Sequence, residues 1–166
     1  MKELWILRHA HAEPYVDEAG DFARRLDGRG RAEAAAIGRL AAALHLNFDH
    51  VLASPAARTL ATAQALVTAV PDGTARVHEE PAVYLADRHA LVAMVRALPA
   101  RCQRALIVGH NPGVSRLVQW ATGDEQSEEL RPATLVGTRA DLDHWPDAMP
   151  GLFERLRVLR PGDAML

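Results

Sequence analysis

The stretch Leu4-Trp5-Ile6-Leu7-Arg8-His9-Ala10 decides the fold, because an apolar run leads directly into an Arg-His pair. The four apolar residues, preceded by charged ones, predict a buried strand. A buried parallel strand delivers the residues that follow it to the carboxyl edge of its sheet, where open α/β folds bind ligands. Arg8 and His9 are therefore expected on the floor of a crevice. There a guanidinium can hold the oxygens of a phosphoryl group, and an imidazole can attack its phosphorus.

A second short apolar run, Val51–Ala53, ends in Ser54-Pro55. Serine followed by proline is a strong helix start, because serine caps the helix and proline tolerates the first helical position. Ser54 is therefore expected to cap a helix that carries Arg58 one turn in.

The clearest buried strand, Ala105–Val108, opens onto Gly109-His110-Asn111-Pro112. Asn111 before proline repeats the pattern of cap and proline, and predicts another helix start. With parallel neighbouring strands, three strand ends would then place their polar residues on one edge of the sheet. The positive ends of the two following helices would attract an anion to that edge.

Between these strands lie segments in which apolar residues recur at helical spacing, so helices are expected to alternate with the strands. Asp27 is the expected N-cap of a helix that ends near Asn47, and further helices are expected to end at Pro99 and at Gly123. Weaker patterns predict strands at Val77-His78, 134–138 and 152–159, and a turn at Pro71–Gly73. The alternation predicts an α/β fold of three layers, with a mostly parallel central sheet and helices on both faces. We expect one domain covering residues 1–166.

Composition narrows the function classes. The chain has 166 residues, 49% of them hydrophobic and 24% charged, and a net charge of −2. The charge gives no general basic field for nucleic acid. Cys102 is the only cysteine, which excludes an internal disulfide and a zinc cluster of cysteines. The sequence has no secretory signal pattern and no apolar run of membrane-spanning length, so we expect a cytoplasmic protein with no membrane partner.

Two common catalytic patterns are missing from the sequence. No Gly-x-x-x-x-Gly-Lys-Ser/Thr segment supports a nucleotide-binding P-loop. No Gly-x-Ser-x-Gly segment supports the nucleophile elbow of a serine hydrolase.

Three segments together resemble a known family. Arg8-His9-Ala10 resembles the Arg-His-Gly signature of the histidine phosphatase (phosphoglycerate-mutase-like) superfamily, and the segment from Ser54 to Thr59 is similar to its Ser-Pro-x-x-Arg-x element. Val108-Gly109-His110-Asn111-Pro112 is similar to its second-histidine segment. The short length and the element from Arg25 to Gly30 resemble the SixA-type phosphohistidine phosphatase branch. The order and spacing of the motifs make the resemblance specific.

The resemblance implies a role for each matching residue. His9 would be the nucleophile that becomes phosphorylated, Arg8 and Arg58 would hold the phosphoryl oxygens, and His110 would donate a hydrogen bond to the same group. Arg25 would be a weaker phosphate contact at the pocket mouth, although Arg24 competes with it in the alignment. Phosphoryl transfer depends mainly on positioning and charge neutralisation, which suits these residues. Neither a metal nor another cofactor is expected, because no cluster of carboxylates would build a two-metal site.

The sequence departs from the family pattern at two places. Ala10 replaces the usual glycine, and its methyl group is expected to narrow the room beside His9. Superfamily members that cleave phosphate esters use an acidic proton donor, and here the nearby acids Glu79, Glu80 and Asp87 do not match that context. An alkoxide leaves poorly without a proton, whereas the imidazole of a phosphohistidine needs a dedicated acid less. A phosphohistidine substrate on a protein, such as a phosphotransfer domain, is therefore favoured.

Two alternatives remain open. One is a phosphomonoesterase for small phosphorylated metabolites, with Glu80 or Asp87 as the acid. The other is a phosphate- or phosphoprotein-binding module without turnover, although binding alone would need only the arginines and helix ends.

Overall fold

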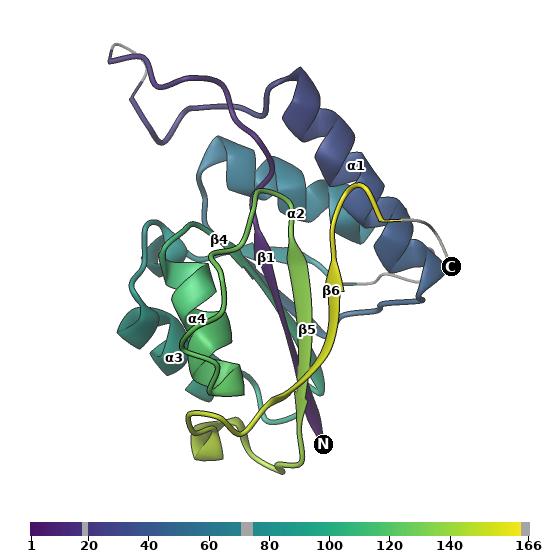
Figure 1. The fold of residues 1–166 in the computed structure, drawn as a ribbon, viewed down its shortest axis with the longest axis vertical. Coiled ribbons are helices and arrows are strands. Elements are labelled where there is room, and N and C mark those ends of the chain that lie inside the picture. The colour runs from purple at the N-terminus through teal and green to yellow at the C-terminus, as the bar shows by residue number, and fades with distance from the viewer. Residues whose placement is uncertain (18–19, 71–74, 164–166) are drawn as a thin grey trace.

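The computed structural model describes residues 1–17, 20–70 and 75–163. Within them lies a six-stranded sheet, flanked by four α-helices and two short 3₁₀ turns (Figure 1). The strands are β1 Lys2–Arg8, β2 His50–Ala53, β3 Val77–Glu79, β4 Arg104–Gly109, β5 Leu135–Ala140 and β6 Glu154–Leu159. The helices are α1 Gly28–Ala43, α2 Ala57–Ala69, α3 Arg88–Arg96 and α4 Gly113–Thr122, and the turns are Pro81–Val83 and Trp145–Asp147.

The sheet has the strand order β3-β2-β4-β1-β5-β6. Its first four strands are parallel, and β5 runs antiparallel to both β1 and β6. Helices α1 and α2 cover one face while α3 and α4 cover the other (Figure 1). The predicted three-layer α/β fold with a mostly parallel sheet is confirmed.

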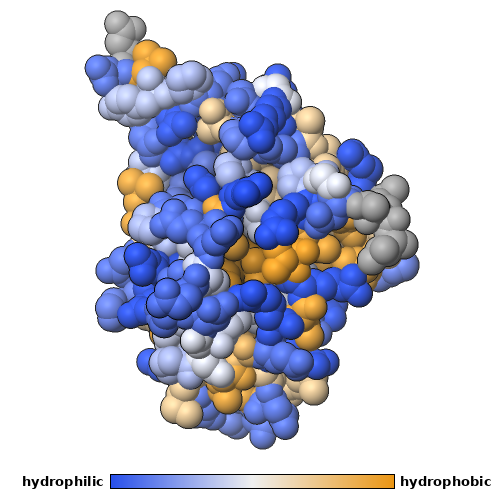
Figure 2. Space-filling view, in the orientation of Figure 1, coloured by the Kyte–Doolittle hydropathy of each residue, from blue (hydrophilic) through white to orange (hydrophobic). Residues whose placement is uncertain are grey.

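The opening strand shows why both faces need helices. Leu4 and Ile6 belong to the core beneath α3 and α4, whereas Trp5 and Leu7 belong to the core beneath α1 and α2. Successive side chains of a strand point to opposite faces, so an uninterrupted apolar run must be buried on both sides. The molecular face in Figure 2 is mostly hydrophilic, as expected when most large apolar side chains lie in the two cores.

Several predicted boundaries need correction. Asp27 caps α1 as predicted, accepting a hydrogen bond from the Gly30 N–H at 2.7 Å. The helix ends at Ala43 rather than near Asn47, because His45 adopts a positive φ of 52° that stops helical propagation. The predicted turn at Pro71–Gly73 lies outside the described residues.

Ser54 and Asn111 do not cap helices, contrary to the prediction. Helix α2 begins at Ala57, so Arg58 is its second residue and lies in the first turn. Helix α4 begins at Gly113, and the side-chain oxygen of Asn111 accepts from the Ser115 hydroxyl at 2.6 Å. Ser54 accepts from the Ala56 N–H at 3.3 Å and contacts His110, and Asn111 Nδ2 donates to the Leu130 carbonyl at 2.9 Å. Each side chain therefore connects segments that are distant in the sequence, which local signals do not reveal.

The segment after His9 leaves the sheet as a loop that is closed at its base. Ala12 pairs with Leu26, and the Glu13 N–H donates to the Arg25 carbonyl at 2.9 Å. Helix α1 packs closely against the backbone at His11. A Cβ on Gly30 would lie 1.8 Å from the His11 carbonyl oxygen, so only glycine fits at this position. The described residues Asp21 and Phe22 of this loop contact Arg58 and the Ala57 N–H, so this part of the loop lies at the carboxyl edge of the sheet. None of the helices in the described ranges is long and apolar enough to cross a membrane.

Candidate active site

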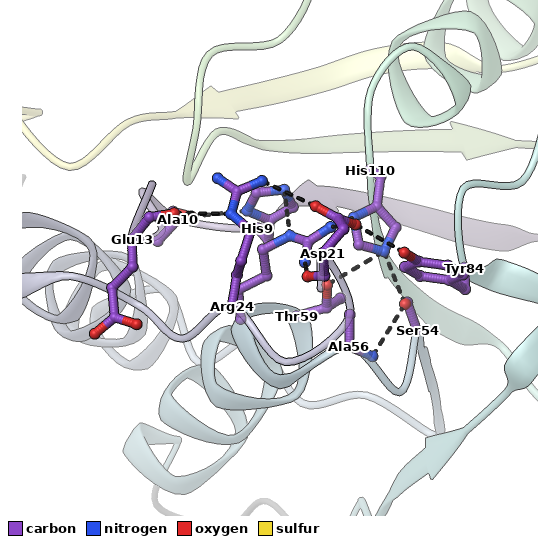
Figure 3. A network of polar contacts seen from close by, with 11 residues as sticks. His9, Ala10, Glu13, Asp21, Arg24, Ser54, Ala56, Thr59, Tyr84 and His110 are labelled. Carbon is purple, nitrogen blue, oxygen red and sulfur yellow. Dashed lines mark hydrogen bonds and ion pairs between the residues drawn. The ribbon is translucent and has the colours of Figure 1, made fainter. Parts of the chain in front are cut away.

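The register of the sheet brings three strand ends together. Arg8 of β1 pairs with Gly109 of β4, and Ala53 of β2 pairs with Val108. Backbone hydrogen bonds extend this register, from the His9 N–H to the Gly109 carbonyl and from the Ser54 N–H to the Val108 carbonyl, both at 3.2 Å. The residues that follow the strands therefore converge on one spot (Figure 3).

His9 is held in one tautomer. Its Nδ1 lies 2.7 Å from the Ala10 carbonyl oxygen, which can only accept, so Nδ1 carries the proton. The lone pair is then on Nε2, and the Arg58 Nε–H points at it over a long distance of 3.4 Å. A neutral imidazole with its Nε2 lone pair facing the pocket is the form that can attack phosphorus. The Ala10 methyl group, expected to narrow the pocket, is instead buried in the core beneath α1 and α2.

Arg58 is the centre of the site, with a side chain only 3% exposed. One edge of its guanidinium faces the two histidines: Nε points to His9, and Nη2 donates to His110 Nδ1 at 3.2 Å. The other edge is held by Asp21, whose carbonyl oxygen accepts from Nη1 at 2.7 Å and whose Oδ2 accepts from Nη2 at 2.9 Å. This grip on the far edge fixes the direction of the edge that faces the histidines.

His110 is also neutral and oriented. Because a guanidinium has no acceptor, the contact with Arg58 means that Nδ1 of His110 is the accepting nitrogen. Its Nε2–H then donates to the Ser54 hydroxyl at 2.7 Å, with Thr59 Oγ1 at 3.4 Å. The ring centroids of His9 and His110 are 5.2 Å apart. His9 Nε2, His110 Nδ1 and the inner edge of Arg58 therefore outline a space suited to one small tetrahedral anion.

Arg8 enters the same region from β1. Its Nη1 donates to the Leu130 carbonyl at 2.7 Å, while its buried Nε has no hydrogen-bond partner among the described residues. A buried donor without a partner is costly unless a ligand satisfies it. Its positive charge is also close enough to contribute to the lowered pKa of His9.

Burial and positive neighbours keep both histidines neutral. Desolvation, and then the charges of Arg58 and Arg8, lower the pKa of His9 to about 4 against the Ala10 hydrogen bond, which raises it. Desolvation, His9 and Arg58 lower the pKa of His110 to about 3. An incoming anion would be the missing partner for this positive cluster.

We expect these two imidazoles to remain unprotonated well below the ordinary histidine pKa of about 6.5. The folded chain then binds fewer protons than the unfolded chain as the pH falls from about 6.5 towards 4, so its unfolding free energy should decrease over that range. Histidine-selective NMR titration of the ligand-free protein checks this directly. A His9 resonance titrating near pH 6.5 would contradict it.

The pocket mouth contains residues that sequence reasoning missed. Asp21 accepts from the Tyr84 hydroxyl at 2.7 Å and from Arg24 Nη1 at 2.9 Å, in addition to its contacts with Arg58. Arg24 therefore lies at the pocket mouth, where Arg25 was predicted. Arg25 is exposed, and its carbonyl accepts a hydrogen bond from the Glu13 N–H. The Asp21-x-x-Arg24 spacing was the available signal, but only the folded loop shows that it reaches the pocket (Figure 3).

The three acids weighed as proton donors have other contacts. Glu80 accepts from the Ala82 N–H and caps the Pro81–Val83 turn. Asp87 accepts from the Ala90 N–H and caps α3. Glu79 is exposed at the end of β3. No group of three His, Cys, Asp or Glu side chains within the described ranges is arranged to hold a metal ion, and metal-independent chemistry stays a prediction.

Comparisons with known proteins show similarity to histidine phosphatases. The model of the histidine phosphatase superfamily (branch 1) matches residues 4–84. The fold matches a protein assigned as phosphohistidine phosphatase SixA from Agrobacterium tumefaciens, with a TM-score of 0.81 and 25% identity over 97% of this chain and 99% of that one. A SixA assignment from Nakamurella multipartitia gives 0.79 and 25% identity over 98% and 97%.

A third structure is similar to this chain in its fold, at a sequence identity too low to show more. It is the protein histidine phosphatase SixA complexed with tungstate, with a TM-score of 0.80 and 19% identity over 96% of this chain and 97% of that one. Among curated proteins, the comparison finds no match.

Proposed function

The chain belongs to the histidine phosphatase superfamily and is a phosphatase, and from this premise we propose that it removes the phosphoryl group from phosphohistidine on a protein. The SixA structures that it resembles at 25% identity carry that assignment. The cluster of His9, His110 and Arg58 supports the phosphoryl-transfer step. The hydrogen bonds of the Asp21 carboxylate support the choice of substrate.

In the proposed mechanism, Nε2 of His9 attacks phosphorus and forms a covalent phosphohistidine intermediate that water then hydrolyses. Arg58 and Arg8 hold the phosphoryl oxygens through their guanidinium donors, including the buried Nε of Arg8. His110 donates to the same group once its Nδ1 carries a proton. The Ser54 hydroxyl can donate or accept, so it supports either tautomer of His110.

The observation that carries the substrate class is that three donors, from Tyr84, Arg24 and Arg58, hold the Asp21 carboxylate. Partial burial alone would raise the pKa of its carboxyl, but hydrogen bonds from Tyr84, Arg24 and Arg58 outweigh this and lower the pKa to about 2. Asp21 therefore has no proton to give to an alkoxide at neutral pH. Glu80 and Asp87 are engaged as helix caps, so neither supports the role of a general acid at the pocket. A substrate whose leaving group departs without a donated proton fits this site best.

We expect the purified protein to cleave a phosphohistidine peptide with a kcat/KM at least about 10²-fold above that for an alkyl phosphate, the range that a general acid usually contributes. Release of inorganic phosphate from both substrates, measured at pH 7 and equal concentrations, checks this.

Two outcomes would count against the proposal in different ways. Efficient turnover of a sugar phosphate with none of the phosphohistidine peptide would favour the small-molecule phosphomonoesterase. Tight anion binding without turnover of any substrate would favour the binding module.

A further inference from the structure

We propose that Asp21 determines specificity by binding the imidazole leaving group of the substrate through the ring N–H that faces away from phosphorus. The inference deepens the proposed phosphohistidine phosphatase function and rests on it. It concerns the mouth of the pocket, where Asp21, Phe22 and Tyr84 lie.

The site has a buried side and a side that faces the solvent. Arg58 is 3% exposed and Ser54 and Thr59 are fully buried, whereas Asp21 is 29% exposed. A leaving group attached to a protein must lie on the solvent side of the phosphoryl group. In-line attack by His9 places that leaving group opposite the nucleophile. Asp21 is the carboxylate that contacts Arg58 among the described residues, and it is the more exposed of the two side chains.

Asp21 keeps room for one more hydrogen bond. A carboxylate has about four acceptor positions. Arg58 Nη2 and the Tyr84 hydroxyl use Oδ2, and Arg24 Nη1 uses Oδ1. One position on Oδ1 is therefore left by the described residues, on a side chain already held in place by three donors. A fixed acceptor of this kind recognises an N–H group with little loss of conformational entropy on binding.

The surroundings of Asp21 fit a flat ring. The Tyr84 ring lies edge-on to His110 with centroids 5.5 Å apart, and Phe22 lies 5.1 Å from Tyr84 in the same type of arrangement. Phe22 follows Asp21 in the chain and is 48% exposed. An imidazole entering beside Asp21 would therefore have aromatic neighbours.

The charge of Asp21 suits the chemistry of this leaving group. A phosphorylated imidazole leaves readily when its other nitrogen carries a proton. The P–N bond then breaks, its electron pair stays on the ring nitrogen, and neutral imidazole departs while His9 Nε2 forms the new bond to phosphorus. A carboxylate beside the second nitrogen stabilises this protonated ring. An alcohol leaving group has no such N–H, so Asp21 gives it no corresponding help.

The test compares two substrates in the Asp21→Asn variant: a phosphohistidine peptide, and p-nitrophenyl phosphate, whose leaving group departs without a proton. We expect kcat/KM for the peptide to fall by about 10- to 100-fold, the value of one charge-assisted hydrogen bond. For p-nitrophenyl phosphate we expect a loss at least about tenfold smaller than the loss on the peptide, because with this substrate the variant loses only the contribution of Asp21 to positioning Arg58. Asp21→Glu, which keeps the charge, should recover part of the loss on the peptide.

Asp17→Asn is the matched control, because it removes an exposed carboxylate from the same loop and should leave both substrates unaffected. Thermal unfolding of each variant checks that the fold is retained. Equal losses on both substrates would mean that Asp21 only positions Arg58, and unchanged rates would mean that it does nothing for the leaving group. Either result overturns this proposal alone. A wild-type protein that cleaves p-nitrophenyl phosphate but not the peptide overturns the proposed function, and this inference with it.

Discussion

Replacement of His9 by alanine is expected to lower kcat by at least about 10⁴-fold on every phosphorylated substrate, because it removes the nucleophile that forms the covalent intermediate. The remaining positive cluster should still bind an anion, since Arg58, Arg8 and His110 are held by their own contacts. The variant should therefore lose turnover but keep affinity for phosphate. Rapid quenching of the wild type with a labelled substrate should trap an acid-labile phosphoenzyme that His9→Ala does not form.

The neighbouring histidine provides the control. His11 is two residues away, but its Nδ1 contacts the Glu33 carboxylate at 2.7 Å, on the side of α1. His11→Gln should keep the phosphoenzyme and most of the activity. If His9→Ala retained label, or if both variants lost it equally, the assignment of the nucleophile would be wrong.

Replacement of Arg58 by lysine is expected to reduce kcat/KM by about 10²- to 10³-fold, although the positive charge is kept. The guanidinium serves both edges at once, with Nη1 and Nη2 on Asp21, and with Nε and Nη2 facing His9 and His110. A lysine ammonium is a point charge and cannot satisfy both groups in this geometry. Steady-state kinetics with p-nitrophenyl phosphate, together with isothermal titration of phosphate, measure the loss.

Arg88→Lys is the matched control, since Arg88 also lies in the first turn of a helix but is 36% exposed and pairs with Glu125. It should change neither activity nor phosphate affinity. An Arg58→Lys variant that kept a third or more of the wild-type kcat/KM would show that the fork geometry is not required.

Local sequence signals predicted the features that depend on a single strand or helix. The apolar run before Arg8 and the one before His110 each specify a strand buried on both faces, and the position of the polar residue after each run follows from chain direction. Asp27 was recognisable as a helix cap because capping involves only residues three apart. The fold class followed from such signals, whereas the family resemblance rested on the three motifs, and both are confirmed.

The two predicted helix caps failed where a side chain also bonds to a segment that is distant in the sequence. Ser54 and Asn111 have the sequence pattern of helix caps, yet Ser54 accepts from His110 as well as from the Ala56 N–H, and Asn111 Nδ2 donates to the Leu130 carbonyl. Such choices depend on which partner tertiary structure brings within about 3 Å, and the local pattern is the same in either case.

The sequence alone determined that the sheet is mostly parallel, in which order the motifs follow the strands, and which residues lie at the carboxyl edge. These features depend on hydrophobic periodicity and strand direction, which are local properties of the chain. Only the tertiary structure decided that Arg24 rather than Arg25 reaches the pocket, and that Asp21 grips Arg58 while Tyr84 donates to it. The physical reason is that the described residues of the loop before α1 form no helix or strand. Its conformation is set by its closed base and by the charged groups it meets across the sheet edge.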